Sequence, residues 1–366
     1  MAIDHPDKHK VSALKDRMVV GLLWIAFSVR TIPVLSQGLW RDEVDQWRFA
    51  YLSLDELVGN LTRPGWNGPL YSLMLRAWIS VTGDSVFSMR YLSVLFGVLC
   101  ISSAYVLGRL LIGRRPAATL ALLLSVSPYM VWYAQEIKMY TWVPFLVLLA
   151  LYATSRGAET GRGPWWVLVL VVTTFAVYSH ILAALLIPVL VIWFWLHPHR
   201  AHKAWVGGLL ALGGLSLPYL PLLRWQAALA FVPRETGFPE RSLGQMAVAL
   251  LNGWSAGISQ GSWGTQRGLL LGMGVTGIIA VIGFTSLFRR RASAALRLIA
   301  WLVVPLLGIC LVSLWSPIFT DRYLIWAAPA FYALVAAGLW RLGRPFRVVA
   351  MVIVLTFFAH GLAVQA

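Results

Sequence analysis

Three carboxylates directly follow the first long apolar run of the chain: Asp42, Glu43 and Asp45. They stand out because only 12% of the residues are charged. A carboxylate at the edge of a bilayer is costly unless water, a cation or a substrate lies beside it, so this cluster indicates a functional site. One carboxylate could accept the proton of an attacking hydroxyl or hold a cation that steadies a phosphate. The alternative is that the acids cap a surface helix.

A second polar group lies between two later apolar runs. Glu136 and Tyr140 are four residues apart and would share one face of a helix, with Lys138 between them. A carboxylate at this point could converge on Asp42. The alternative is a solvated loop in which Lys138 neutralises Glu136.

Two further positions carry polar side chains at the ends of apolar runs. His180 occupies a very short turn, where it could bind phosphate, ligate a metal or serve as a structural hydrogen-bonding group. Arg322 and Tyr323 begin a late apolar run. An arginine at that depth pairs with a carboxylate or an anionic headgroup, or extends to the interface. Arg30 raises the same question in the first run.

The sequence specifies no cofactor, although a divalent cation stays open because Asp42, Glu136 and His180 could supply ligands. The chain has no Walker P-loop, no G-x-G-x-x-G motif after a strand, no H-E-x-x-H and no C-x-x-C pair. Its two cysteines, Cys100 and Cys310, lie inside apolar runs and are interpreted as buried apolar residues. Chemistry on a nucleotide bound by a soluble domain is therefore excluded.

The elements that position these residues are membrane helices. The chain has 366 residues and is 59% hydrophobic, which exceeds what one soluble core would bury. Successive apolar stretches are long enough for helices that cross roughly 30 Å of hydrocarbon. We therefore predict an all-α polytopic membrane protein with about eleven transmembrane helices. The predicted spans are 18–36, 88–108, 116–131, 141–155, 164–178, 181–196, 204–223, 268–288, 298–315, 324–340 and 348–363.

The charge distribution predicts the topology. The net charge of +16 could indicate nucleic-acid binding, but the basic residues form short clusters between apolar runs, so no nucleic-acid partner is expected. The positive-inside rule places these clusters and the N-terminus in the cytoplasm, and the Asp42 cluster on the trans side of the cell (inner or plasma) membrane. The only acids on the cytoplasmic side are then Asp4, Asp7, Asp16 and Glu159.

The chain is predicted to form one integral membrane domain, 1–366, without a soluble C-terminal domain. Its first outer loop, 37–87, mixes charges with interfacial aromatics, which predicts short amphipathic helices on the membrane surface. The stretch Leu70–Val81 is not counted as a span, because counting it would place the basic cluster at Arg114 outside. In the second long outer loop, 224–266, the segment 241–252 has helical apolar spacing and could lie on the surface.

Five motifs in order resemble those of the polytopic GT-C glycosyltransferases of the family 39 type, which include protein O-mannosyltransferases and the lipid A aminoarabinose transferase. The order and spacing are similar along most of the chain. The motifs are Leu39-Trp40-Arg41-Asp42-Glu43, Gly68-Pro69-Leu70-Tyr71, Ser88-Met89-Arg90-Tyr91-Leu92-Ser93, Ser127-Pro128 leading to Tyr133 through Tyr140, and Arg322-Tyr323-Leu324 with Pro329.

The resemblance implies transfer of a sugar from a polyprenyl-phosphate donor to an acceptor on the trans side, with inversion. By resemblance, Asp42 would be the general base with Glu43 beside it, and Glu136 would be the acid of the next outer loop. Arg322 and Lys138 would offset the charge of the phosphate. The candidate catalytic residues are Asp42, Glu43 and Glu136, and the candidate substrate-binding residues are Lys138, Tyr140, His180, Arg322 and Tyr323.

The chain also departs from the family. Asn67-Gly68-Pro69 stands where relatives often carry His-Pro-Pro, and the sequence stops at Ala366 where many members continue. The sugar, the carrier length and the acceptor, whether lipid, glycan or protein, are not specified.

Two other functions are weighed against sugar transfer. One is a transporter or lipid flippase with a polar path lined by Asp42, Glu136 and Arg322. Transporters usually carry such groups near the bilayer midplane in repeated halves, and no repeat is visible here. The other is an inactive scaffold, in which these three residues would be far apart. Within the acidic cluster, Asp42 is predicted to be the functional residue and Asp45 a structural one.

Overall fold

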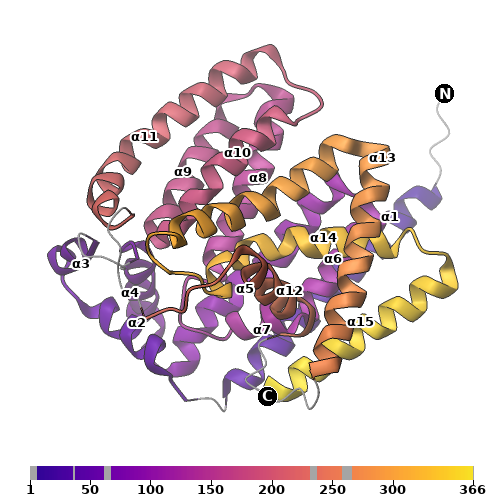
Figure 1. Cartoon of the computed structure of the whole chain (residues 1–366), viewed down its shortest axis with the longest axis horizontal. Helices are drawn as coiled ribbons and strands as arrows, with labels where there is room; N and C mark the ends of the chain where they lie inside the picture. Colours follow the sequence, from indigo (N-terminus) through magenta and orange to yellow (C-terminus); the bar gives the residue numbers. More distant parts are fainter. Residues whose placement is uncertain (1–5, 36–37, 62–66, 231–236, 258–265, 366) are drawn as a thin grey trace.

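The computed structural model describes residues 6–35, 38–61, 67–230, 237–257 and 266–365 (Figure 1). Every regular element in these ranges is a helix. The elements up to residue 160 are α1 (Pro6–Thr31), η1 (Pro33–Leu35), α2 (Arg41–Tyr51), α3 (Leu54–Leu61), α4 (Leu70–Thr82), α5 (Val86–Leu111), α6 (Arg114–Val126), α7 (Pro128–Tyr133) and α8 (Trp142–Thr160). Those that follow are α9 (Gly163–Ser179), η2 (Ile181–Leu185), α10 (Leu186–Trp195), α11 (His202–Ala230), α12 (Leu243–Ala256), α13 (Gln266–Ser313), η3 (Asp321–Ala327), α14 (Ala328–Leu339) and α15 (Arg344–Gln365).

The helices have the length and composition of membrane spans. Within the described ranges, four helical segments are long and apolar enough to cross a bilayer: Val86–Leu111, Leu270–Ser313, Asp321–Leu339 and Arg344–Gln365. The predicted fold class, an all-α polytopic membrane protein, is confirmed. The count of about eleven spans stays a prediction, because several of the predicted spans are interrupted or shorter in the structure.

The predicted span 116–131 is such an interrupted helix. It consists of α6 and α7, which meet at Ser127 and Pro128. Ser127 caps α7 by accepting a hydrogen bond from the backbone N–H of Met130, and Pro128 fits the first helical position because it has no N–H to satisfy.

The break leaves carbonyls in the last turn of α6 without helical partners. The buried guanidinium of Arg30, from α1, donates to the carbonyl oxygens of Leu124 at 2.9 Å and Ser125 at 2.8 Å. Arg30 therefore supplies the hydrogen bonds that the last carbonyls of α6 lack. This is the role of the arginine in the first predicted span.

The long helix α13 is bent at Arg291, whose φ of −147° and ψ of 66° are not helical. It contains the predicted span 268–288 and the predicted span 298–315 up to Ser313, and Figure 1 shows the bend on the right of the view. Both α13 and η3 pack against α14, all of whose residues are buried. At the contact between α13 and α14, Gly283 lies so close to the partner helix that a Cβ would stand 2.0 Å from the carbonyl oxygen of Leu334.

Short helices occupy the first outer loop, as predicted. Figure 1 shows α2, α3 and α4 together at the left edge of the molecule. Gln46 of α2 donates to Ser72 of α4 at 2.8 Å, and Arg76 of α4 donates to the carbonyl of Ala50 at 2.6 Å. With 13 residues, α4 is about 20 Å long, shorter than the hydrocarbon layer, in keeping with its exclusion from the spans.

Parts of both predicted outer loops, 62–66, 231–236 and 258–265, lie outside the described residues. The predicted helix 241–252 corresponds to α12. Its residues Met246, Leu250 and Trp254 are buried, because the helix packs against α13 and α15. One side of α12 is therefore part of the protein interior.

Candidate active site

The centre of the candidate site is an ion pair between Asp42 and Arg322. Asp42 lies in the first turn of α2, where a negative charge interacts favourably with the helix dipole, and Arg322 lies at the start of η3. The Oδ2 atom of Asp42 is 3.1 Å from Nη1 of Arg322, and the two side chains are 30% and 21% exposed. The wide separation expected of a scaffold is therefore not found for these two residues.

Aromatic rings surround the other faces of Arg322. Its guanidinium carbon lies 5.7 Å from the ring centroid of Trp40, 5.9 Å from that of Tyr140 and 6.0 Å from that of Tyr323, distances at which cation–π attraction operates. Its Nε atom is buried and has no hydrogen-bond partner among the described residues. Arg322 is thus held in place by the ion pair and by the three rings.

Glu43 is fully buried and its carboxylate joins three segments. Its Oε1 atom accepts from Nε of Arg90 on α5 at 2.8 Å and from the backbone N–H of Ile137 at 3.0 Å. Its Oε2 atom accepts from Nη2 of Arg90 at 2.5 Å and from the backbone N–H of Trp40 at 3.3 Å. These bonds fix α2, and therefore Asp42, relative to α5 and to the segment that carries Glu136.

Glu136 follows α7, outside the predicted spans, and is only 6% exposed. Its Oε1 atom accepts from Nε1 of Trp132 at 2.9 Å, whereas its Oε2 atom is buried without a partner among the described residues. Burial raises the pKa of Glu136 to about 8, although the nearby charge of Arg322 opposes the rise. The carboxyl group is therefore mostly protonated near neutral pH and has an O–H to donate.

Lys138 belongs to the same segment. Its burial lowers the pKa of its ammonium group, an effect that the nearby charge of Asp42 opposes and that of Arg322 reinforces. These mutual effects mean that Lys138, Asp42, Glu136 and Arg322 share one electrostatic environment. The predicted convergence of Glu136 on Asp42 is in line with these interactions, although no direct contact between the two carboxyl groups is found among the described residues.

His180 directly follows α9 and lies against Tyr323, with the two ring centroids 5.0 Å apart. It is 4% exposed, and neither ring nitrogen has a partner among the described residues. Burial lowers the pKa of His180 to about 3, with a further contribution from Arg322 and Lys138, so the imidazole is neutral. A neutral imidazole offers one donor and one acceptor to an uncharged polar ligand.

The turn that carries His180 is approached closely by the Asn67-Gly68-Pro69 motif. A Cβ on Gly68 would stand 1.8 Å from the backbone carbonyl oxygen of Tyr178. Glycine is required here because only a residue without a side chain permits this approach. The segment in which this chain departs from His-Pro-Pro is therefore in direct contact with Tyr178, near the end of α9.

Sequence reasoning gave no role to two residues that the structure places in this region. Arg90 is the partner of Glu43; its position near the start of a span was a signal, since a charge there needs a partner. The carboxylate of Asp321 accepts from the hydroxyl of Tyr133 at 3.2 Å, and its backbone carbonyl accepts from Tyr129 at 2.9 Å. Its adjacency to Arg322 was the available signal.

The described residues do not provide a metal-ligand set. No three His, Cys, Asp or Glu side chains gather within these ranges as ligands would. The charge nearest to Asp42 is a guanidinium, and both oxygens of Glu43 accept hydrogen bonds. We therefore derive no step through a cation.

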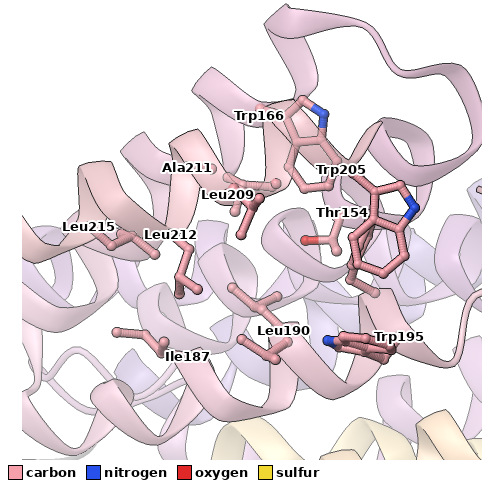
Figure 2. Close-up of a pocket in the computed structure, with 14 residues that line it drawn as sticks. Thr154, Trp166, Ile187, Leu190, Trp195, Trp205, Leu209, Ala211, Leu212 and Leu215 are labelled. Carbon is pink, nitrogen blue, oxygen red and sulfur yellow. The ribbon is translucent and has the colours of Figure 1, made fainter. Parts of the chain in front are cut away.

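The apolar cavity shown in Figure 2 is separate from this site. It has a volume of about 130 Å³ and lies among α8, α9, α10 and α11. The rings of Trp166, Trp195 and Trp205 flank one part of it, and Leu190 and Leu212 line another. No predicted site residue lines this cavity.

Part of the sequence matches a known protein family, and the fold is similar to those of solved structures. Residues 63–225 match the family described as dolichyl-phosphate-mannose-protein mannosyltransferase. The structure is similar to that of the oligosaccharyltransferase AglB from Archaeoglobus fulgidus in complex with an inhibitory peptide and a dolichol-phosphate, with a TM-score of 0.62 and 14% identity over 96% of this chain and 55% of that one. No curated protein sequence matches.

A second solved structure is that of ArnT from Cupriavidus metallidurans. The TM-score is 0.61 in the apo state, with 17% identity over 94% of this chain and 62% of that one. ArnT bound to undecaprenyl phosphate gives a TM-score of 0.58. The resemblance to GT-C glycosyltransferases is confirmed: the chain is an integral membrane protein with their fold, and it spans a little over half the length of these two relatives.

Proposed function

We propose that the protein transfers a sugar from a polyprenyl-phosphate donor to an acceptor on the extracytoplasmic side of the membrane. The observation that carries the proposal is the Asp42–Arg322 ion pair, because the charge of Arg322 also acts on Glu136, whose Oε2 atom has no partner among the described residues. A base, a cation and an undissociated acid in one place suit attack on a sugar phosphate. The dolichol-phosphate in the AglB structure and the undecaprenyl phosphate in that of ArnT support the same class of donor.

The proposed reaction is a single displacement. The oxygen of an acceptor hydroxyl attacks the anomeric carbon and its proton passes to the carboxylate of Asp42. The bond between that carbon and the phosphate oxygen breaks, and its electron pair leaves with the lipid phosphate. Because attack and departure occur on opposite faces, the configuration inverts. Such proton transfer typically contributes roughly 10²–10⁴-fold in rate.

Arg322 is the proposed phosphate-binding residue. In the structure, its guanidinium is shared between Asp42 and three aromatic rings, and its Nε atom has no partner in the part of the chain that the structure describes. A phosphate that binds this group competes with Asp42 for it, so donor binding releases the carboxylate to act as a base. Lys138 adds a second positive charge where negative charge accumulates on the leaving group.

The other candidates take supporting roles in this proposal. Glu43 positions Asp42, because both of its carboxylate oxygens already accept hydrogen bonds from protein donors. Protonated Glu136 donates a hydrogen bond to the sugar or to a phosphate oxygen. The neutral imidazole of His180 and the rings of Tyr140 and Tyr323 shape the sugar pocket.

The charge pattern supports the extracytoplasmic location. Arg322 lies at the start of η3, and the basic cluster at Arg341 follows the end of α14, which continues from η3. Asp42 is paired with Arg322, and its neighbour Glu43 is paired with Arg90 near the start of α5, whose other end precedes the basic cluster at Arg114. The positive-inside rule places those clusters in the cytoplasm. The transporter alternative is not favoured, because the candidate residues gather at one end of the helices and not near their middle.

Replacement of the proposed base tests the function. In membranes supplied with polyprenyl-phosphate mannose as the probe donor, we expect Asp42→Asn to reduce release of polyprenyl phosphate by about 100-fold or more at unchanged protein abundance. The matched control is Asp55→Asn, because Asp55 is an exposed carboxylate of the same outer segment. Near-normal release by Asp42→Asn, with an active wild type, would refute the role of Asp42.

A further inference from the structure

A second cavity lies where α5, α6, α13 and α14 end or bend. It has a volume of about 270 Å³. Four arginines line it: Arg115 from α6, Arg290 and Arg291 from α13, and Arg341, which follows α14. The helix α13 is interrupted at Arg291, which itself lines the cavity. The fold therefore gathers four guanidinium groups around one hollow.

Among the residues that the structure describes, none with a carboxylate lines the cavity. Its other lining residues are apolar or uncharged, including Ser286 and Trp340. The sequence has no acid between Asp84 and Glu136, and the only one after Glu240 is Asp321, at the other end of the η3 and α14 run. Positive charges gathered at this density are stabilised by an anion, and the lining side chains do not supply one.

One wall of the cavity is a fixed aromatic ring. The indole N–H of Trp340 donates to the hydroxyl of Thr119 at 2.8 Å, which sets the orientation of the ring. The guanidinium of Arg115 lies 5.7 Å from this ring, and that of Arg347 lies 4.2 Å from it. Arginine side chains held in this way lose less conformational freedom when they bind a phosphate.

The cavity and the candidate active site lie at opposite ends of the same helices. Arg90 near the start of α5 contacts Glu43, whereas Ile112, just after the end of α5, lines the cavity. The intervening helix is about 30 Å long, the thickness of the hydrocarbon layer. Likewise, Arg322 lies at the start of η3, and Arg341 lies just after the end of α14, which continues directly from η3. The cavity therefore belongs to the other face of the membrane.

We propose that this cavity binds the phosphate headgroup of an anionic phospholipid of the cytoplasmic leaflet. Basic pockets between transmembrane helices on that side are suited to such headgroups. A lipid is favoured over free phosphate because exposed apolar side chains follow or precede the arginines closely in the sequence. Phe288, two residues before Arg290, is 45% exposed, and Phe346 and Val348, five and seven residues after Arg341, are 71% and 56% exposed. These side chains would contact the acyl chains while the arginines hold the phosphate.

Lipid binding by the delipidated protein tests the proposal. Native mass spectrometry with phosphatidylglycerol as the probe would compare wild type, Arg290→Gln/Arg341→Gln and the control Arg289→Gln/Arg344→Gln. Both pairs remove two positive charges, but Arg289 and Arg344 are exposed and do not line the cavity. We expect the cavity pair to lower phosphatidylglycerol occupancy by about tenfold or more, and the control pair to retain it.

A third variant separates the cavity from net charge. Ser286→Phe fills the cavity without altering the charge, and it is expected to lose phosphatidylglycerol binding as well. It also provides a test if the double variant does not fold. Equal binding by cavity and control variants would overturn the proposal. Occupation of the site by inorganic phosphate, with no binding of phosphatidylglycerol, would overturn the lipid assignment.

Discussion

The carboxylate of Asp42 in α2 and the guanidinium of Arg322 in η3 form an ion pair of 3.1 Å, although the two residues are 280 positions apart in the sequence. The pair holds the carboxylate of Asp42 against Arg322. An anion that binds Arg322 competes with Asp42 for the guanidinium and frees the carboxylate. This relationship links donor binding to base catalysis in the proposed reaction.

The role of Arg322 predicts the effect of a charge-conserving substitution. Arg322→Lys keeps the positive charge but loses the planar group that lies over three aromatic rings and the free Nε donor. We expect a rise of about tenfold or more in the KM for polyprenyl-phosphate mannose, together with a lower kcat. Steady-state kinetics in proteoliposomes measure both values.

Arg241→Lys is the matched control for this substitution. Arg241 also lies over an aromatic ring, that of Phe319 at 5.7 Å, but it lies outside the proposed phosphate site. Unchanged kinetics are expected for this control. Similar kinetic losses in both variants would contradict a specific phosphate-binding role for Arg322.

The buried pair of Glu43 and Arg90 predicts a large effect on stability. Glu43→Gln leaves a guanidinium that is only 3% exposed without its charge partner, which we expect to cost about 3–5 kcal/mol. Glu159→Gln breaks the exposed pair with Arg156, in which the side chains are 33% and 51% exposed, and is expected to cost less than about 1 kcal/mol. Unfolding in detergent compares the two variants.

A double substitution distinguishes the pair from a general effect of the mutation. Glu43→Gln/Arg90→Met removes both charges, so it is expected to be more stable than Glu43→Gln alone. The two residues do not act as a pair if the double variant loses as much free energy of unfolding as Glu43→Gln and Arg90→Met lose together.

The sequence predicted the class of fold and the types of residue in the site because both follow from local chemistry. Apolar length predicts membrane helices, and the acids of the first outer loop were conspicuous in a chain of low charge. The partners of these residues could not be predicted in the same way. The contacts of Asp42 with Arg322 and of Glu43 with Arg90 depend on how distant helices pack.

The division of roles within the acidic cluster also depends on packing. Asp42 and Glu43 are adjacent in the sequence, yet Asp42 is part-exposed and Glu43 is fully buried. The side chains of neighbouring helical residues point about 100° apart, so one can face a site while the other faces the core. The spacing of the residues alone did not show which one would do so.

The close approach of Gly68 to Tyr178 predicts a local steric effect. A methyl group at position 68 would overlap the carbonyl oxygen of Tyr178, so Gly68→Ala should displace the turn that carries His180. We expect a loss of about 1–3 kcal/mol in stability and reduced sugar transfer. Gly163→Ala is the control, because nothing lies within 4 Å of a Cβ at that position. Equal melting temperatures for the two variants would contradict the contact.

The raised pKa of Glu136 predicts how stability changes with pH. Its pKa is about 8 in the folded protein against an ordinary value of 4.5. Between these values the unfolded chain has lost the proton that the folded protein retains, so this group lowers stability as pH rises from 4.5 to about 8 and adds no further change above that. Because Gln cannot ionise, the stability of Glu136→Gln relative to wild type should increase across this range, by at most about 5 kcal/mol.

The same variant tests whether the protonated form of Glu136 acts in transfer. Wild-type activity should fall above about pH 8, where Glu136 ionises and loses its O–H. Glu136→Gln keeps an N–H donor and should lack this alkaline decrease, whereas Glu240→Gln, at an exposed position, should retain it. Unfolding midpoints and rates of polyprenyl phosphate release between pH 5 and about 9.5 measure both effects. Parallel pH profiles for wild type and Glu136→Gln would show that Glu136 is not the group that titrates.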